Sequence, residues 1–483
     1  MPATMYDALP YRSVARTATY VDRIAAVGRL LGIDTADSNH CRVLELGCGD
    51  GGNLIPMAVS LPGSEFVGID LARSAIERGI AAASAIGASN VSLHQADIAG
   101  IGDMGEFDYV IAHGVYSWVP PEVRAALLRV IREHMRPAGL AFVSYNAMPG
   151  DHIRGVVRQM MRMHTAGIED PRKKLEQARA LLQMLEQAPG DAGDVYRPLL
   201  RSEVGRALQS SDELLFHDDL ADISQPFFFS EFMAAAQAAG LQFASEAVFH
   251  SMNLSTLPPD LGRLLTDLAA RDVIAKEQYL DFLTCRGFRQ TLLCQREVEL
   301  RRDVDAERIS QFRFFSEAQR TEPDAGQPGV AFRHRNGSAL RTDHALTIRA
   351  MEALLAANPR SVPFGELAEG AGATSPEDRE ALANVLFQAF SVGVIELRLF
   401  EPRIMLELGE RPEASPWARY TAASGRSANL YHELIELDEP AKRLLPLADG
   451  SRTLAELATA AELDLPATTR TFQELAKLAL LVG

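Results

Sequence analysis

The chain has 483 residues, of which 47% are hydrophobic and 23% charged, and its formal net charge at pH 7 is −16. This length is too great for one ordinary core, so we expect about three domains of a globular protein. The negative charge argues against a nucleic-acid partner, because phosphate contacts need a basic surface. It would favour a cationic partner such as a lysine-rich protein, although solubility alone also explains it.

Cysteine spacing and hydropathy predict the cellular compartment of the protein. The four cysteines, Cys41, Cys48, Cys285 and Cys294, form no C-x-x-C pair, so we expect neither a metal site nor a disulfide framework. No uncharged apolar run approaches the roughly 18 residues that a membrane span requires, and residues 1–20 lack the apolar segment of a leader. We therefore expect a cytoplasmic protein without a membrane span.

The N-terminal part of the chain reads as one helix followed by alternating strands and helices. Apolar side chains at helical spacing, among them Ile24 and Val27, predict a helix over 19–33 that Gly32 ends. Strands and helices then alternate over 42–145. This alternation predicts an α/β fold with a parallel, doubly wound sheet.

The stretch RVLELGCGDGGN at 42–53 organises this region. An apolar strand that carries Glu45 runs directly into Gly47, Gly49 and Gly51. Glycines allow the backbone to turn tightly and to bring its N–H groups against a ligand, while the next helix presents its positive N-terminus. The spacing of Gly47, Gly49 and Gly52 also satisfies G-x-G-x-x-G, a motif that would fit a nicotinamide cofactor as well.

Two further acids follow the glycine loop. Asp70 ends the predicted strand at 65–69, at the distance where α/β folds place an acid on ribose hydroxyls. Asp97, in the string HQADI, lies near the end of a third strand at 91–95. The position of Asp70 does not decide whether a nicotinamide or another cofactor binds. Asp97 and Glu45, the acid inside the first strand, tilt the choice away from a nicotinamide cofactor.

The order ELGCG, GID, QADI and FDYVIAHGVYSWV resembles the class I S-adenosylmethionine-dependent methyltransferases over the first 145 residues. This resemblance implies that the glycine loop passes under the methionine part of the cofactor. It also implies that Asp70 binds the ribose and that Asp97 and Ile98 contact adenine. Leader segments in this family often cover the cofactor cleft, a role that we assign to Tyr6 and Tyr11.

Beyond Gly150 the alternation stops, and helical, charged segments follow. We interpret these segments as insertions at about 150–225 and 252–285, which commonly provide substrate specificity. The predicted sheet still lacks its last antiparallel hairpin. The strand patterns at 241–249 and 288–296 are the candidates for it.

Two similar units follow a polar segment, 316–340, that we expect to be a linker or an exposed ribbon. Each unit reads as a helix, a short helix, a long helix and a final strand, which predicts a mainly helical, winged-helix-like C-terminal region. The third helices carry few lysines or arginines, so protein contact or dimerisation is favoured over DNA binding. We expect these units to serve assembly or acceptor recognition and not cofactor binding.

Several longer strings give a closer resemblance, to bacterial methyltransferases that carry a regulatory domain and include the rickettsial outer-membrane-protein lysine methyltransferases. The strings are YDALPYRS, RVLELGCGDGGNLIPMA, HGVYSWVP, SYNAMPG, FHDDL with PFFFSEF, and DFLTCRGFRQTLL. Two departures concern the acceptor: an expected PGW reads Pro149-Gly150-Asp151, and an expected His-Pro is absent at Thr19-Tyr20-Val21. The cofactor contacts that we assign are Tyr6, Tyr11, Glu45, Gly47, Cys48, Gly49, Asp70, Leu71, Asp97, Ile98 and His113.

The resemblance also suggests how the chain is divided. A cleft-covering segment (1–40) would precede the S-adenosylmethionine-binding core (41–150). A regulatory-type part with helical insertions and the closing strands (151–303) would follow. Two winged-helix-like units would complete the chain, at 304–400 and 401–483.

Methyl transfer from a sulfonium is an in-line displacement, so the protein mainly aligns acceptor, methyl group and sulfur and excludes water. We expect Tyr116 and Trp118 to wall the acceptor slot, and His113 or Tyr145 to take a proton. The favoured acceptor is a lysine of a protein or peptide. The alternatives are an N- or O-methyltransferase of a small molecule or modified peptide, and a non-catalytic protein that senses the cofactor.

Overall fold

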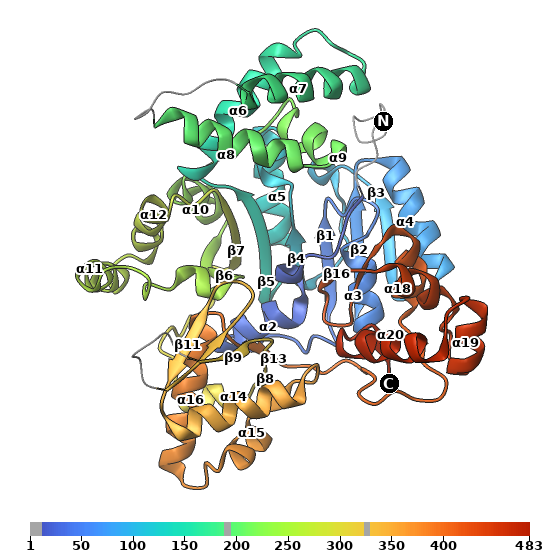
Figure 1. Cartoon of the computed structure of the whole chain (residues 1–483). Helices are drawn as coiled ribbons and strands as arrows, with labels where there is room; N and C mark the ends of the chain where they lie inside the picture. The colour runs from blue at the N-terminus through green and yellow to red at the C-terminus, as the bar shows by residue number, and fades with distance from the viewer. Residues whose placement is uncertain (1–11, 188–194, 323–328) are drawn as a thin grey trace.

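The structure is a computed structural model, and it describes residues 12–187, 195–322 and 329–483. Tyr6 and Tyr11 therefore lie outside the described residues. Figure 1 shows a central sheet with helices on both sides and a group of helices beyond one end of it. Two smaller units, orange and red, lie beside the other end of the sheet.

The central sheet has seven strands in the order β3-β2-β1-β4-β5-β7-β6. The first five are parallel, while β7 runs antiparallel to both β5 and β6. This order confirms the predicted class I methyltransferase sheet and its closing hairpin. The strands are β1 (Arg42–Leu46), β2 (Glu65–Asp70), β3 (Val91–Gln95), β4 (Phe107–Ala112), β5 (Met135–Asn146), β6 (Leu241–Glu246) and β7 (Phe288–Gln295).

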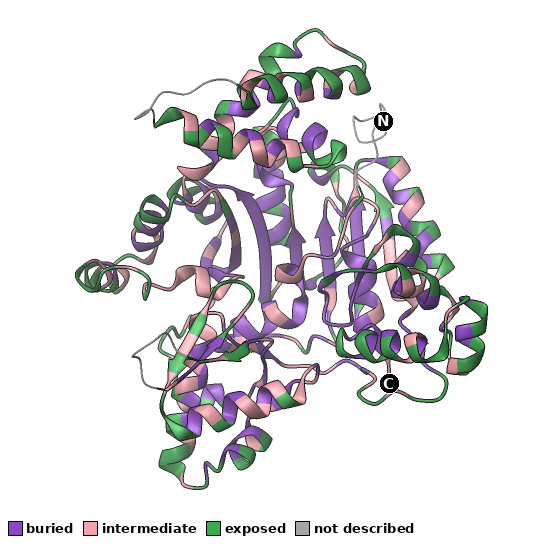
Figure 2. Ribbon diagram, viewed as in Figure 1, coloured by how far each residue is buried: buried purple, intermediate pink, exposed green. Residues whose placement is uncertain are grey.

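Alternate side chains of these strands enter two different cores. Val43, Phe66 and Ile111 face α2, α3 and α4, whereas Leu44 and Val67 face α5 and α10. Because helices cover both faces, the strands are apolar on both sides and appear buried in Figure 2. The helices are α2 (Val21–Leu30), α3 (Leu54–Ser60), α4 (Arg73–Ala85), α5 (Pro121–His134) and α10 (Phe229–Ala238).

The predicted insertions are helical. After β5, three helices pack around their own small core, which includes Val157, Leu182 and Val204. Figure 1 shows them in green beyond the end of the sheet where β5 leads into the first of them. The helices are α6 (Gly150–His164), α7 (Pro171–Glu186) and α8 (Tyr196–Gln209); a second insertion holds α11 (Pro259–Ala269) and α12 (Val273–Thr284).

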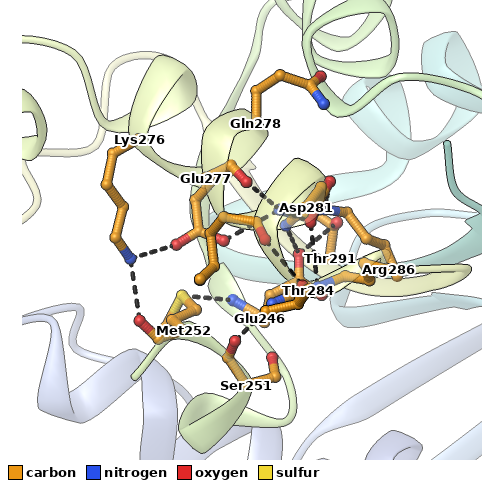
Figure 3. A network of polar contacts seen from close by, with 12 residues as sticks. Glu246, Ser251, Met252, Lys276, Glu277, Gln278, Asp281, Thr284, Arg286 and Thr291 are labelled. Carbon is orange, nitrogen blue, oxygen red and sulfur yellow. Dashed lines mark hydrogen bonds and ion pairs between the residues drawn. The ribbon is translucent and has the colours of Figure 1, made fainter. Parts of the chain in front are cut away.

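A buried ionic network fixes α12 against the hairpin. The Arg289 guanidinium donates to Asp281 at 2.8 Å, to Glu246 at 2.7 Å and to Glu277 at 3.1 Å. Figure 3 shows these three carboxylates converging from α12 and β6, with Lys276 beside Glu277. A buried cation needs such partners, because an unpaired charge in the interior is costly. The network thus joins the second insertion rigidly to the sheet.

Two helical units follow β7, in the predicted order of helix, short helix, long helix and strand. The described parts of the 316–340 segment belong to the first unit, where β10 pairs antiparallel with both β9 and β11, so the segment is a ribbon and not only a linker. The first unit has β8 (Arg313–Phe315), β9 (Gln319–Thr321), β10 (Val330–Arg333), β11 (Ala339–Thr342), α14 (Ala345–Ala357), β12 (Val362–Pro363), α15 (Phe364–Ala371), α16 (Pro376–Ser391) and β13 (Glu396–Arg398). The second has β14 (Glu413–Ala414), α17 (Pro416–Thr421), β15 (Arg426–Ala428), β16 (Leu434–Glu436), α18 (Glu439–Leu444), α19 (Leu454–Ala460), α20 (Leu465–Lys477) and β17 (Leu481–Val482).

The second unit, drawn red in Figure 1, packs against the methyltransferase core beside α3. Trp417 of α17 and Ala428 of β15 belong to the same apolar core as Val43 and Leu54. Trp417 is buried there, which makes the contact a part of the folded interior. The C-terminal unit is therefore docked directly behind the helix that follows the glycine loop.

Candidate cofactor and acceptor site

The loop between β1 and α3 requires its glycines. Gly47, Gly49 and Gly51 have φ angles of +78°, +57° and +72°, which side chains disfavour. A Cβ atom on Gly47 would lie 2.5 Å from Val115 Cγ2, and one on Gly49 would lie 2.4 Å from Ser13 Oγ. The loop is thus enclosed by the turn after β4 on one side and by the N-terminal segment on the other.

Cys48 contributes packing and backbone to this loop. Its side chain is buried under β2, where a Cβ atom on Gly68 would lie 2.8 Å from Cys48 Sγ. Burial raises the pKa of this thiol well above its usual value. A cofactor contact at Cys48 would therefore involve its backbone.

Glu45 is a buried carboxyl group with one oxygen unused. Oε1 accepts a hydrogen bond from Asn53 Nδ2 at 2.8 Å, while Oε2 has no partner among the described residues. Burial raises the pKa of Glu45 to about 8, although the bond from Asn53 opposes this shift. Since buried polar atoms are nearly always paired, the free oxygen indicates a place for a hydrogen-bond donor or a cation.

Asp70 lies where β2 ends, next to the loop. Oδ1 accepts from the Ala72 amide and Oδ2 accepts from the Gly49 amide, both at 2.8 Å. Burial raises the pKa of Asp70, and these two bonds oppose the rise. Each carboxylate oxygen has another lone pair, so the group can still accept from ribose hydroxyls. Leu71 follows it with an exposed apolar side chain.

The end of β3 places the third acid at the same edge of the sheet. Asp97 is exposed, and its Oδ1 accepts from the Ala99 amide at 2.9 Å in a short 3-10 turn. Ile98 beside it is buried. Gln95 Nε2 donates to the Leu71 carbonyl at 3.3 Å, which links the ends of β3 and β2. The structure therefore brings the assigned ribose and adenine residues to adjacent strand ends.

His113 follows β4 and is held by a serine of β5. Ser144 Oγ accepts from the Gly114 amide at 2.8 Å and lies 3.0 Å from His113 Nδ1. The hydroxyl hydrogen is free to donate to Nδ1, and the ring then carries its proton on Nε2. Burial, with Arg16 nearby, lowers the pKa of His113 to about 3. The ring is therefore neutral at physiological pH and a weak base.

Tyr116 and Tyr145 belong to a buried aromatic cluster. The Tyr116 ring lies 5.1 Å from both Phe227 and Phe232, and Tyr145 stacks on Phe232 at 4.1 Å. The Tyr145 hydroxyl is 3.1 Å from Thr291 Oγ1, and its side chain faces the opposite side of the sheet from the residue before it. This burial argues against the predicted proton transfer by Tyr145. It also places Tyr116 inside the core and not on an open wall.

Trp118 is half-buried and faces the first insertion. The Arg158 guanidinium of α6 lies 5.7 Å from the centre of the Trp118 ring. Arg158 also lines a cavity of about 240 Å³ together with Asp151, Ser224 and Pro226. Of the four residues expected at the acceptor slot, His113 and Trp118 are partly buried, whereas Tyr116 and Tyr145 are buried.

Several residues that shape the site were not predicted. Asn53 holds Glu45, Ser144 holds His113, and the exposed Phe288 ring lies edge-on to His113 at 6.4 Å. Ser13 covers the glycine loop and donates its backbone N–H to Asp50 Oδ1 at 3.1 Å. The strings around these residues matched the family as a whole, but a single sequence does not show which polar side chains pair across the fold.

No helix within residues 12–187, 195–322 and 329–483 is long and apolar enough to cross a membrane. In the same residues, no group of three or more histidine, cysteine, aspartate or glutamate side chains could hold a metal ion. The four cysteines are free thiols.

Three segments of the sequence match known families. Residues 44–141 match "Methyltransferase domain", residues 211–295 match "Predicted methyltransferase regulatory domain", and residues 410–465 match "PKMT, C-terminal winged helix domain". Two proteins of Rickettsia prowazekii are similar over longer stretches. "Uncharacterized protein RP789" is 35% identical over 308 residues, 64% of this chain and 55% of that protein. "Uncharacterized protein RP028" is 32% identical over 233 residues, 48% of this chain and 93% of that protein.

Solved structures of PKMT2 from Rickettsia typhi share the whole architecture. One has a TM-score of 0.87 and 25% sequence identity, and covers 98% of this chain and 100% of that chain. Another, in complex with AdoHcy, has a TM-score of 0.86 and 24% identity over the same shares of the two chains. The chain spans about half the length of RP789 but the full length of the PKMT2 structures.

The sheet order, the glycine loop and the matched core define a class I S-adenosylmethionine-dependent methyltransferase, whose cofactor is S-adenosylmethionine. Within this class, the chain belongs to the family that combines the core with the predicted regulatory domain and the PKMT C-terminal winged helix domain.

The described residues fit this cofactor. S-adenosylmethionine has a cationic amino group and a sulfonium, and the unused Glu45 oxygen is a buried acceptor beside the loop. Asp70 has lone pairs left for ribose hydroxyls, and Leu71 offers an exposed apolar surface beside it. The loop beside them has no room for side chains, since Cβ atoms at Gly47 and Gly49 would collide with Val115 and Ser13.

Proposed function

We propose that the protein methylates lysine side chains of a protein or peptide. The observation that carries the proposal is the likeness to PKMT2 over 98% of the chain, which includes the regulatory and winged-helix parts as well as the cofactor-binding core. The formal net charge of −16 supports a cationic, lysine-containing acceptor.

S-adenosylmethionine supplies an electrophilic methyl group. In the proposed site the glycine loop, Glu45 and Asp70 bind the cofactor, while Asp97 and Ile98 border its base. The turn after β4 holds the acceptor, with Trp118 against Arg158, a residue that lines the cavity. These groups bind and orient the reactants and exclude water, which is the main requirement of an in-line displacement.

His113 in its neutral form does not remove the proton of a lysine ammonium efficiently, because its pKa is lowered to about 3. The acceptor must therefore arrive as the neutral amine or lose its proton to water. With a pKa of about 10.4, only about one lysine in 2,500 is neutral at pH 7. The rate of a lysine methyltransferase should consequently rise between pH 7 and 9, until the amine is neutral in the bound state.

The experiment combines acceptor discovery with this pH profile. The purified chain is incubated with S-adenosylmethionine and either a protein extract or a metabolite extract, and products are sought by mass spectrometry as additions of 14 Da or its multiples. Lysine modification in the protein extract, with a rate that rises with pH, is the expected result. Modification confined to the metabolite extract would favour the small-molecule alternative, and a flat profile would reject an amine acceptor.

We also propose that the protein acts in the cytoplasm as a homodimer and without nucleic acid. Free cysteines support a reducing compartment. The exposed side chains Tyr279, Phe282 and Leu283 of α12 form an apolar surface that supports self-association. Light scattering of the purified chain should give twice the monomer mass.

A further inference from the structure

A residue of the C-terminal unit contacts the cofactor side of the methyltransferase core. Asn53, directly after the glycines, is 4% exposed and has polar partners on both ends of its side chain. The backbone N–H of Arg16 donates to Asn53 Oδ1 at 2.9 Å. Since a backbone N–H can only donate, this bond fixes Oδ1 on that side and leaves Nδ2 for Glu45.

Two more donors face Asn53 Oδ1: the Thr19 hydroxyl at 3.0 Å and His432 Nε2 at 2.9 Å. His432 is fully buried and stacks on Tyr20 with ring centres 5.6 Å apart. It occupies the tip of the loop between β15 and β16, where its φ angle is +63°. The Asn429 side chain holds this tip by accepting the backbone N–H groups of Tyr431 at 3.0 Å and Glu433 at 2.8 Å. The imidazole is thus held in place before any ligand binds.

The direction of the bond follows from the same geometry. Asn53 Oδ1 accepts, so His432 must donate from Nε2, and the ring is the neutral tautomer with its proton there. Nδ1 has no partner among the described residues, and burial lowers the pKa of His432 to about 3. A proton on Nδ1 would be buried without an acceptor, which is costly.

We propose that His432 is a positioning residue for cofactor binding, which acts through Asn53 to hold Glu45 beside the glycine loop. The chain of contacts runs from His432 Nε2 to Asn53 Oδ1, and from Asn53 Nδ2 to Glu45 Oε1. Without His432, the Asn53 amide keeps the donors of Arg16 and Thr19 but loses the imidazole N–H, so its oxygen, and with it the amide nitrogen on Glu45, is held less firmly. The C-terminal unit therefore forms part of the cofactor site, in contrast to the expectation from the sequence.

The proposal rests on the cofactor that the proposed function requires, and its test uses binding of S-adenosylhomocysteine without any acceptor. In His432→Leu the donor is lost and the volume is kept, so calorimetric affinity should fall by roughly three- to tenfold. In His432→Gln the side-chain amide reaches the Nε2 position, so affinity should return to within about twofold of the wild type. Both variants carry the same strain at a positive φ, which therefore cancels in their comparison.

Two further variants keep the test decisive if His432→Leu does not fold. Asparagine tolerates a positive φ well but is one carbon too short, so His432→Asn should fold and bind as weakly as the leucine variant. Tyr431→Phe is the matched control, because it removes only the neighbouring bond from the Tyr431 hydroxyl to Glu401 at 2.7 Å. This control should bind S-adenosylhomocysteine like the wild type, even if its thermal midpoint falls.

A double-mutant cycle separates positioning from general packing. If His432 acts through Asn53, then His432→Leu should weaken binding no further in an Asn53→Ala background. Additive losses, an unaffected folded His432→Asn, or a His432→Gln as weak as His432→Leu would each overturn the proposal. Failure of the wild-type chain to bind S-adenosylhomocysteine would instead contradict the proposed function, and the two failures are thus distinguishable.

Discussion

At the level of single residues, the buried carboxyl group of Glu45 should make cofactor affinity depend on pH. Burial raises its pKa to about 8, so the free protein holds this carboxyl protonated at pH 7. A cationic cofactor stabilises the ionised form, so binding must release a proton. The affinity for S-adenosylmethionine should therefore rise between pH 6 and 7.5, toward a limit of about tenfold per pH unit.

Calorimetry in buffers of different ionisation enthalpy measures this proton release directly. The range stops at pH 7.5, because the amino group of the ligand itself titrates at about 7.7 to 8.0. Glu45→Gln should bind more weakly at pH 7.5 and show little dependence on pH. The same slope in wild type and variant would assign the proton to another group.

Asp70 provides a test of the ribose assignment. Hydrogen bonds from two hydroxyls to a carboxylate contribute about 1.5 to 3 kcal/mol, so Asp70→Ala should weaken S-adenosylmethionine binding tenfold or more. Glu65→Ala is the matched control, because Glu65 begins the same strand and pairs with Arg42 at 2.8 Å at the far end of the sheet. Unchanged calorimetric affinity in the aspartate variant, with a native circular dichroism spectrum, would remove Asp70 from the site.

The turn after β4 carries Tyr116 and Trp118, which we expected from the sequence to wall the acceptor slot together. The structure places their side chains in different surroundings. Tyr116 packs inside an aromatic cluster, whereas Trp118 lies against Arg158, a residue that lines the cavity. Trp118→Ala should leave cofactor affinity within a few-fold but reduce turnover strongly, because a misplacement of about 1 Å can cost roughly a hundredfold.

Steady-state rates and cofactor titrations of three variants test this separation. Trp118→Phe keeps an aromatic wall and should recover most of the rate. Tyr116→Ala should instead lower the free energy of unfolding by about 3 to 5 kcal/mol, as expected for a large buried aromatic side chain. Full turnover by a folded Trp118→Ala variant would reject the slot.

The sequence predicted those elements whose signals are local. The periodicity of apolar residues predicted the sheet, and the glycines with the acids that follow them predicted the cofactor loop and the adjacent strand ends. These features depend on residues that are close together in the sequence. Tyr145 shows the limit of this reasoning. Successive side chains of β5 point to opposite faces of the sheet, and Ser144, not Tyr145, lies beside His113. A shift of one residue in register would exchange the two side chains, and the sequence alone does not fix that register. His432 carried no local signal, because its partner Asn53 lies 379 residues away in the sequence.

For the whole molecule, coupling between the C-terminal unit and the cofactor must act in both directions. If His432 strengthens cofactor binding, then bound S-adenosylhomocysteine must strengthen the docking of the loop at 429–433. We expect slower hydrogen exchange in this loop and in α17 when the ligand is added. Exchange in α15, which lies in the other C-terminal unit, should not change. Equal exchange in the docked loop with and without ligand would contradict the coupling.

The 379-residue separation between Asn53 and His432 also bears on synthesis of the chain. All seven strands of the sheet precede residue 296, so the core can assemble on the ribosome while the C-terminal unit is still being made. At that stage Asn53 has no imidazole beside it, and Trp417 has not yet covered the apolar surface behind α3. Full cofactor affinity should therefore arise only after release of the finished polypeptide, so an incomplete nascent chain would compete poorly for the cellular methyl donor.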